Sequence, residues 1–128
     1  MFTAFLFLFA AASPDVVVVP DGKFSRGSDR APDEAPVLQI GVSRFAIDRT
    51  EVSVEAFEEF VRGGWSDRQA WTKDGLAWRD AHPGGEGREM RAAGRRGDHP
   101  VVAVTWFEAD AYARWIGKRL PCDFEWVK

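Results

Sequence analysis

Six tryptophans in a chain of 128 residues constrain this sequence more than any other feature. Trp carries a large, rigid ring, and a high density of Trp is typical of loops held down by aromatic packing or of a binding face. Trp65, Trp71 and Trp78 fall within residues 65–98, which show no periodic hydrophobicity. Because so long an irregular stretch is rare in a compact domain, we expect its aromatic side chains to pack it down.

The composition is that of one globular domain, with 45% hydrophobic and 29% charged residues. The net charge of −3 argues against a basic surface for nucleic acid, so no nucleic-acid partner is expected. Cys122 is the single cysteine, which excludes an internal disulfide. His82 and His99 alone are too few for a zinc site.

An uncharged apolar run, Met1–Ala12, opens the chain. It is too short to span a membrane, and Ala10–Ala12 fit a signal-peptide cleavage site before Ser13. We therefore predict a signal peptide at residues 1–12, a secreted or periplasmic protein, and no membrane association after cleavage. No Lys or Arg precedes the run, so a misassigned start codon or a buried first strand remain alternatives.

Short strands are predicted in the first fifty residues. The β-branched run Val16–Val19 predicts one strand, and Asp21–Gly22 predicts a hairpin turn to a return strand at Lys23–Gly27. A loop is expected at Ser28–Pro36, where two prolines fall. Alternating apolar residues then predict a further strand, formed by Leu38–Val42 and by Phe45–Ile47 in the opposite phase, with a β-bulge expected at Ser43–Arg44.

Two amphipathic helices are predicted in the remainder. Ser53 is a suitable N-cap for a helix over Val54–Arg62, which Gly63–Gly64 would end. Thr105 and Glu108 match a capping box before a helix over Phe107–Ile116, ended by Gly117. The apolar run Val101–Thr105 before it predicts a buried strand. Cys122, Asp123 and Glu125 mark the start of a third helix, with acids in its first turn.

Three segments together resemble the formylglycine-generating enzyme (sulfatase-modifying factor) family. HPVVAVTWFEADAYARWIGKRLPCDFEW, residues 99–126, is similar to the family signature HPVxxVSWxDAxAYCxWxGKRLPTEAEWE. VVPDGKFSRG, residues 18–27, resembles its opening IPGGxFxMG, and FAIDRTEVS, residues 45–53, resembles FxIDxxEVT. The resemblance covers residues 16–128 in the order of the family.

The resemblance implies a loop-rich α+β domain with a modified C-type-lectin-like fold, of which residues 16–128 form the N-terminal portion of a truncated domain. It implies relatedness to oxygen-dependent oxidases that convert a protein cysteine to formylglycine. Copper and calcium are implied as cofactors only through family residues that are absent here. A protein or peptide substrate, or the missing C-terminal half, is the partner that it implies.

This sequence departs from the family signature at positions that weaken the prediction of catalytic activity. Ala113 stands where the family has Cys, and Cys122 stands where it has a capping Thr. No catalytic, cofactor-binding or metal-binding residue of the family can be carried onto this chain. Whether the chain is an enzyme is therefore left open, between an oxidase portion that is inactive alone and a non-catalytic lectin-like binding module or inactive gene fragment.

Candidate residues were weighed against structural roles. Cys122 is a conceivable nucleophile, since a helix N-terminus stabilises a thiolate, but we expect a structural role. His99 is expected to make a structural hydrogen bond and His82 to be solvated. We expect Lys118–Arg119 to compensate the charge of a helix C-terminus or to form a buried ion pair, and Arg95–Arg96 to be solvated. Five further acids were considered for acid–base or calcium chemistry and expected to be structural: Asp48, Glu51, Asp110, Asp123 and Glu125.

Overall fold

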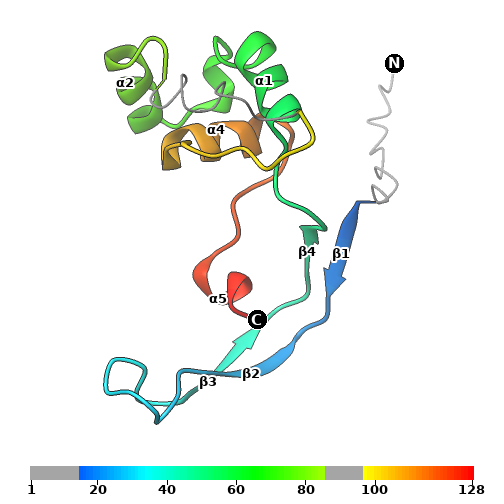
Figure 1. Ribbon diagram of the computed structural model, residues 1–128, viewed down its shortest axis with the longest axis vertical. Helices are drawn as coiled ribbons and strands as arrows, with labels where there is room; N and C mark the ends of the chain where they lie inside the picture. Colours follow the sequence, from blue (N-terminus) through cyan, green and yellow to red (C-terminus); the bar gives the residue numbers. More distant parts are fainter. Residues whose placement is uncertain (1–14, 86–96) are drawn as a thin grey trace, which may run out of the picture. The chain divides into compact units, whose positions relative to one another are not determined.

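The computed structural model describes residues 15–85 and 97–128, which divide into two compact units (Figure 1). The ribbon unit comprises the chain up to Thr50 together with Asp123–Lys128, and the helical unit comprises Glu51–Cys122. Short strands and helices of both units make up an α+β chain, as predicted. The predicted signal peptide at 1–12 and the Arg95–Arg96 pair lie outside the described residues.

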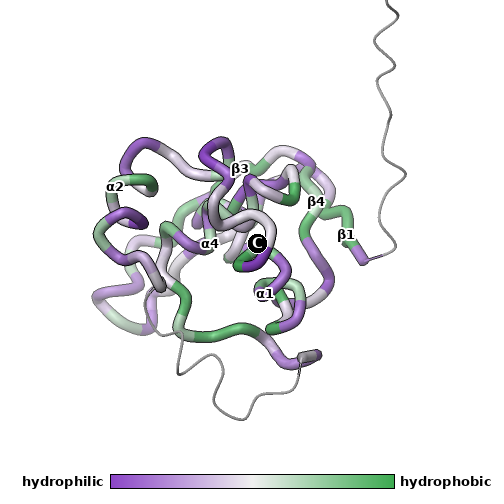
Figure 2. The backbone as a smooth tube through the Cα atoms, turned by 90° about the horizontal axis from the view of Figure 1, so that it is seen from above, coloured by the Kyte–Doolittle hydropathy of each residue, from purple (hydrophilic) through white to green (hydrophobic). Residues whose placement is uncertain are grey.

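Two antiparallel two-stranded ladders form the ribbon unit. One pairs β1 (Val16–Val19) with β4 (Phe45–Asp48), and the other pairs β2 (Gly22–Arg26) with β3 (Leu38–Val42). The predicted hairpin between the first two strands is therefore wrong, because the chain runs straight on from β1 into β2. Pairing β1 with β4 sets valines against Phe45 and Ile47, an apolar match that Lys23–Gly27 does not offer. Figure 2 shows β1 as a hydrophobic stretch.

The predicted β-bulge at Ser43–Arg44 is also wrong. Two residues on each side, Pro20–Asp21 and Ser43–Arg44, separate the two ladders, so neither strand carries an extra residue. Pro20 has no N–H to donate, which accounts for the interruption. The change of phase itself is confirmed, because the half-buried residues switch from Ile40 and Val42 to Phe45 and Ile47.

The loop predicted at Ser28–Pro36 joins β2 to β3. Gly27 opens it with φ +91°, and a Cβ there would collide with the Glu34 carbonyl oxygen. The Ser28 N–H donates to that same oxygen over 3.1 Å. Only glycine fits a position that combines a positive φ with so close a backbone approach.

Helix α1 (Val54–Gly63) confirms the first predicted helix, with the Ser53 side chain accepting a hydrogen bond from the Ala56 N–H. Gly64 is the C-cap residue of α1, but the structure needs a glycine there for a different reason from the predicted glycine cap. Gly64 is right-handed, with φ −104°, so no left-handed cap requires glycine. A Cβ on Gly64 would instead stand 2.6 Å from Phe60 and 2.7 Å from Trp115.

Residues 65–98 are more regular than predicted. They contain a 3-10 turn, η1 (Arg68–Ala70), and a helix, α2 (Lys73–Ala81). The Thr72 side chain caps α2 by accepting from the Gly75 N–H over 3.1 Å. Gly75 has poor helix propensity and the helix is short, so no periodic pattern revealed it. Thr72 followed by Asp74 is the N-terminal signal that was available.

No strand forms over Val101–Thr105, and that prediction is wrong. Ala103 takes φ +54°, which breaks any extended run. The isolated β-bridge of this region joins Ser53 to Pro100, just before the segment, and the Val101 N–H donates a 2.8 Å hydrogen bond to the Val52 carbonyl. Val101 and Val104 still pack against the core, which is what their apolar character indicated.

Helix α4 (Trp106–Trp115) confirms the second predicted helix and its capping box. Gly117 ends it with φ +74°, and the N–H groups of Gly117 and Lys118 donate to the Arg114 and Ala113 carbonyls. This is a Schellman motif. The third predicted helix exists as the single turn α5 (Asp123–Trp126) in the ribbon unit.

An aromatic cluster fills the helical unit, where α4 packs against α1, η1 and α2. Phe60 lies at its centre and is fully buried. The centroids of five rings lie within 6.0 Å of its own: Phe57, Trp65, Trp71, Tyr112 and Trp115. The prediction that aromatic side chains pack down this stretch is therefore confirmed for residues 65–85, while residues 86–96 lie outside the described part of the chain.

Candidate functional site

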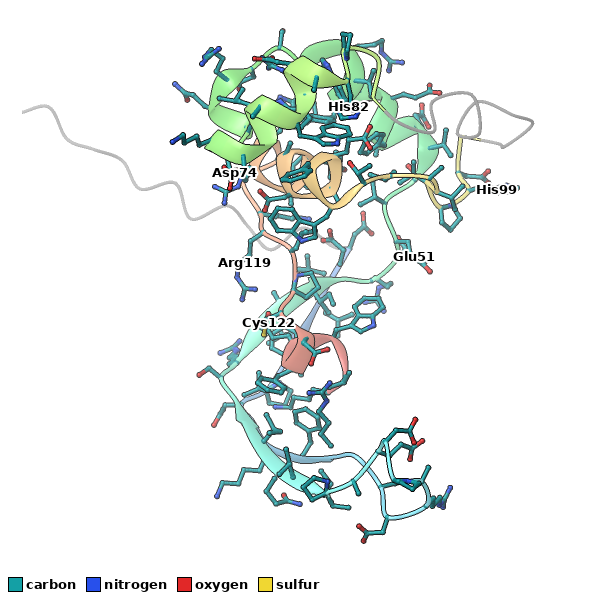
Figure 3. All side chains as sticks on the ribbon, turned by 90° about the vertical axis from the view of Figure 1, so that its left-hand side faces the viewer. Glu51, Asp74, His82, His99, Arg119 and Cys122 are labelled. Atoms are coloured by element: carbon teal, nitrogen blue, oxygen red, sulfur yellow. The ribbon has the colours of Figure 1, made fainter. Side chains whose placement is uncertain are left out.

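The structure does not bring the candidate residues of the helical unit together. Figure 3 shows His82 and His99 well apart, with Glu51 and Cys122 at further separate positions. Among residues 15–85 and 97–128, no three His, Cys, Asp or Glu side chains converge on a point where they could hold a metal ion. Copper prefers soft sulfur ligands, and calcium needs six to eight oxygens. The described residues fit neither metal.

Cys122 is exposed and directly precedes α5 in the chain. A four-residue helix provides too few aligned peptides to act as a strong anion site. It stands at the place where the signature has a capping residue, and a structural role for it stays a prediction.

The acids have separate structural partners or positions. Asp110 accepts a 2.8 Å hydrogen bond from Arg114 Nε, the i, i+4 pair expected on this helix. Asp123 pairs with Arg26 in the ribbon unit over 2.8 Å. Asp48 lies half-buried in β4, and Glu51 is exposed. Glu125 lies half-buried in the first turn of α5, as predicted.

Glu108 is a buried acid whose Oε2 oxygen is held by the N-cap of its own helix. Its Oε2 accepts from the Thr105 N–H at 2.8 Å and from the Thr105 hydroxyl at 2.9 Å. Its own N–H donates to Thr105 Oγ1. The side chain is fully buried, so the capping box extends into the core of the helical unit.

The prediction that His82 is solvated is wrong. Its ring stacks on Trp78 with centroids 4.8 Å apart, and Nδ1 lies 2.8 Å from the Trp78 carbonyl oxygen. The Gly and Pro residues around His82 predicted a loop, but His82 is the C-cap residue of α2 and packs on that helix. The His99 backbone carbonyl accepts a hydrogen bond from the Val54 N–H over 2.9 Å, and a structural role for its side chain stays a prediction.

Lys118 and Arg119 follow the end of α4 and are both exposed. The alternative of a buried ion pair is therefore wrong for these two residues. Arg119 Nη1 donates to the Leu120 carbonyl, and the position after the helix C-terminus suits cations. Charge compensation at the end of α4 accounts for the pair.

Arg79 is a partly buried cation, with 14% of its side chain exposed, that the sequence reasoning missed. Its Nη1 donates to the Trp65 carbonyl at 3.1 Å, and its guanidinium lies 5.7 Å from the Trp71 ring centroid. Trp71 Nε1 donates to the same Trp65 oxygen, and Asp80 pairs with the guanidinium at 3.0 Å. The arginine thus connects α2 to the loop before η1. Nothing in the sequence around Arg79 predicted these contacts.

Two tryptophans differ from the other four. Trp106 on α4 is 61% exposed and Trp126 on α5 is 70% exposed, while Trp65, Trp71, Trp78 and Trp115 pack in the core of the helical unit. The expectation that most of the tryptophans are core residues is confirmed. Exposed tryptophans are costly to leave in water, so these two mark candidate contact surfaces, one on each unit.

No helix among the described residues is long and apolar enough to cross a membrane.

Comparison with known proteins bears on the chemistry. A family model described as "Sulfatase-modifying factor enzyme 1-like domain" matches residues 8–128. A Chlamydia pneumoniae protein named serine/threonine-protein kinase pkn1 is 35% identical over 119 residues, covering 88% of this chain and 18% of that protein. The Mycobacterium tuberculosis formylglycine-generating enzyme is 33% identical over 153 residues, covering 88% of this chain and 50% of the enzyme.

A third relative carries a name that denies activity. The Bos taurus protein named inactive C-alpha-formylglycine-generating enzyme 2 is 32% identical over 148 residues, covering 88% of this chain and 47% of that protein. The chain thus spans about half the length of the two formylglycine-type relatives and under a fifth of the kinase. The family match over nearly all of the chain shows that it belongs to the sulfatase-modifying factor family, that of the formylglycine-generating enzymes.

Proposed function

We propose that this chain is the scaffold portion of an oxidase of the formylglycine-generating type. In this role the 128 residues supply the aromatic core and one wall of a modified C-type-lectin-like domain. The groups that bind the metal and oxidise a protein cysteine with oxygen come from polypeptide outside these residues. A protein or peptide that presents the cysteine is the proposed substrate.

The distribution of polar side chains carries the proposal. Several of these side chains have structural partners: Glu108 caps α4, Asp110 pairs with Arg114, and His82 stacks on Trp78. Among the described residues, no three His, Cys, Asp or Glu side chains converge on a point where they could hold a metal ion. Cys122 is the single thiol of the whole chain, whereas copper chemistry of this type calls for more than one soft ligand. Residues of this kind support a domain rather than a redox centre.

Export is a second part of the proposal. The uncharged apolar run at Met1–Ala12 has the length of a signal-peptide core and ends in an Ala-rich cleavage site. We infer cleavage before Ser13 and a secreted or periplasmic location. N-terminal sequencing of the protein from culture supernatant or periplasm checks this, and an intact Met1 on the exported protein would contradict it.

A chimera tests the scaffold role. Residues 16–128 replace the matched region of the Mycobacterium tuberculosis formylglycine-generating enzyme, and the product is supplied with copper and a Cys-x-Pro-x-Arg peptide. Aldehyde captured by a hydrazide probe is the expected result. A chimera that melts cooperatively by circular dichroism yet forms no aldehyde would contradict the scaffold role, because the domain would then be folded and inactive.

A non-catalytic binding module is the second candidate, favoured by the two exposed tryptophans. Exposed aromatic rings are typical of surfaces that stack on ligands. A lectin-like module would bind a ligand by itself, with Trp106 or Trp126 in the contact. Quenching of tryptophan fluorescence by a saccharide panel, lost in Trp106→Ala or Trp126→Ala, distinguishes this role from the scaffold role.

A further inference from the structure

Five aromatic side chains of the helical unit form an unbroken line of rings. The centroids of successive rings lie 5.0 Å apart from Trp65 to Trp71, 6.3 Å from Trp71 to Trp78, 5.8 Å from Trp78 to Phe107 and 5.6 Å from Phe107 to Trp106. Each separation falls within the roughly 4.5–7 Å that is typical of interacting aromatic pairs. We refer to these five side chains as the ring line, and four of them are tryptophans.

The two ends of the ring line lie in different surroundings. Trp71 is 5% exposed, and the rings of both Trp65 and Trp71 lie 6.0 Å from that of the fully buried Phe60. Trp106, at the other end, is 61% exposed. The ring line therefore connects the centre of the aromatic cluster to solvent through rings that neighbour one another.

A positive charge lies beside the buried end. The Arg79 guanidinium is 5.7 Å from the centroid of the Trp71 ring, and its Nη1 donates to the Trp65 carbonyl. A cation attracts a neutral aromatic ring but repels the same ring once that ring has lost an electron. The exposed Asp80 carboxylate pairs with Arg79 over 3.0 Å and offsets only part of this repulsion. A radical cation is therefore less stable at Trp71 than at Trp106, where water solvates the charge.

We propose that the ring line carries one-electron oxidising equivalents from the core of the helical unit to Trp106. The indole ring is among the side chains that lose one electron most readily, and neighbouring π-systems let the resulting vacancy pass from one ring to the next. Phe107 bridges Trp78 and Trp106. The inference does not depend on the oxidase role, since every ring in the line belongs to this chain.

The electrons and protons of the transfer balance. A peroxyl radical takes one electron from a core tryptophan and becomes a hydroperoxide anion, which leaves a Trp radical cation. The neighbouring ring nearer the surface supplies the missing electron, and repetition of this step moves the radical cation to Trp106. There Nε1 releases its proton to water, and a soluble thiol returns a hydrogen atom to the neutral radical. Two thiyl radicals then join as a disulfide, and the tryptophans are restored.

Photo-oxidation of the purified 128-residue chain tests the ring line. Ultraviolet light absorbed by indole ejects electrons from buried and exposed rings alike, and dissolved oxygen takes up each electron as superoxide. A neutral Trp radical that combines with superoxide and a proton gains two oxygen atoms and becomes N-formylkynurenine. Peptide mass spectrometry then measures the product at each tryptophan. Packing alone would not link the oxidation of one ring to the presence of another.

Trp106→Phe removes the exposed end of the line while keeping an aromatic ring there. The product at Trp71 and Trp78 should rise by about threefold or more, because the oxidising equivalent then stays in the core; the repulsion from one cation at this distance is large enough for such a ratio. Trp126→Phe is the matched control. Trp126 is 70% exposed but lies in the ribbon unit, outside the ring line, so this variant should leave the product at both positions unchanged.

Phe107→Leu removes the bridge and leaves Trp106 in place. The product should fall at Trp106 and rise at Trp78. A soluble thiol should lower the total product more in the unsubstituted chain than in Trp106→Phe, because the thiol repairs the radical at the exposed ring. Near-UV circular dichroism shows whether each variant is folded as the parent is, and Trp106→Phe decides the matter if Phe107→Leu is not.

Three outcomes would overturn the proposal. The first is unchanged product at Trp71 and Trp78 in Trp106→Phe, and the second is an equal rise in Trp126→Phe. The third is product at Trp106 that a folded Phe107→Leu does not lower, because light would then oxidise that ring directly and nothing would reach it from the core. Equal protection by the thiol in Trp106→Phe and the unsubstituted chain would contradict the exit at Trp106.

Discussion

Phe60→Ala should be the most damaging single truncation in the helical unit. The Phe60 side chain is fully buried, and its ring centroid lies 5.6–6.0 Å from those of five other aromatic rings. Removing a buried Phe typically costs about 3–5 kcal/mol through lost transfer free energy and a residual cavity. Five neighbouring rings cannot all move inward, so we expect the upper part of that range. Such a loss is a large share of the roughly 5–15 kcal/mol by which domains are stable.

Thermal melting followed by near-UV circular dichroism measures the effect. Trp126 is the one tryptophan outside the helical unit, so the signal reports mainly on the aromatic cluster. For a unit of this size, 3 kcal/mol or more lowers Tm by roughly 12 °C or more. Trp106→Ala is the control: its ring is mostly exposed and contacts Phe107 edge-on, so it should cost less than about 1.5 kcal/mol. A Phe60→Ala cost below about 1 kcal/mol would refute the packing described for the cluster.

Three further predictions follow from single positions and from the ribbon. Gly64→Ala should cost about 1–3 kcal/mol by overpacking against Phe60 and Trp115, measured by urea denaturation; an unchanged midpoint would show that the two rings can move apart. Thr105→Ala should cost about 1–2 kcal/mol because it removes the hydroxyl from the capping box of a buried Glu108, whereas Thr105→Ser should retain most of the stability in the same melt. Amide hydrogen exchange should be much faster in β1–β4 than in α1 and α4, since two-stranded ladders are marginal; equal protection would show that the ribbon is already covered in the isolated chain.

The sequence predicted those elements whose signals are local. Ser53, Thr105 and Gly117 each act through hydrogen bonds within a few residues, so their caps and helix ends were readable from spacing. The aromatic packing of residues 65–85 also followed, because a high density of rigid rings is typical of loops held down by aromatic packing. In these places the local preference and the tertiary structure agree.

Predictions failed where contacts between residues far apart in the sequence determine the structure. The choice of β4 over β2 as the partner of β1 depends on apolar matching across the ribbon, which a nearby Asp–Gly turn signal obscured. Ala103 adopts a positive φ, which an alanine does not predict because positive φ is uncommon for residues other than glycine. Arg79 lies near the end of α2, and its contacts with the Trp65 carbonyl and the Trp71 ring depend on segments outside that helix, so its role could not be read from sequence neighbours. His82 packs on Trp78 four residues earlier, a contact that the sequence predicts only once α2 is recognised.

We propose that these 128 residues support a domain and do not themselves carry the oxidation. The most direct test incubates the purified chain alone with copper, oxygen, a thiol reductant and a Cys-x-Pro-x-Arg peptide, with the Mycobacterium tuberculosis enzyme as the positive control. The account predicts no aldehyde from the chain and hydrazide-reactive peptide from the control. Aldehyde formed by the chain alone, and lost in Cys122→Ser, would contradict the account, because the single thiol of the chain would then be part of a working redox centre.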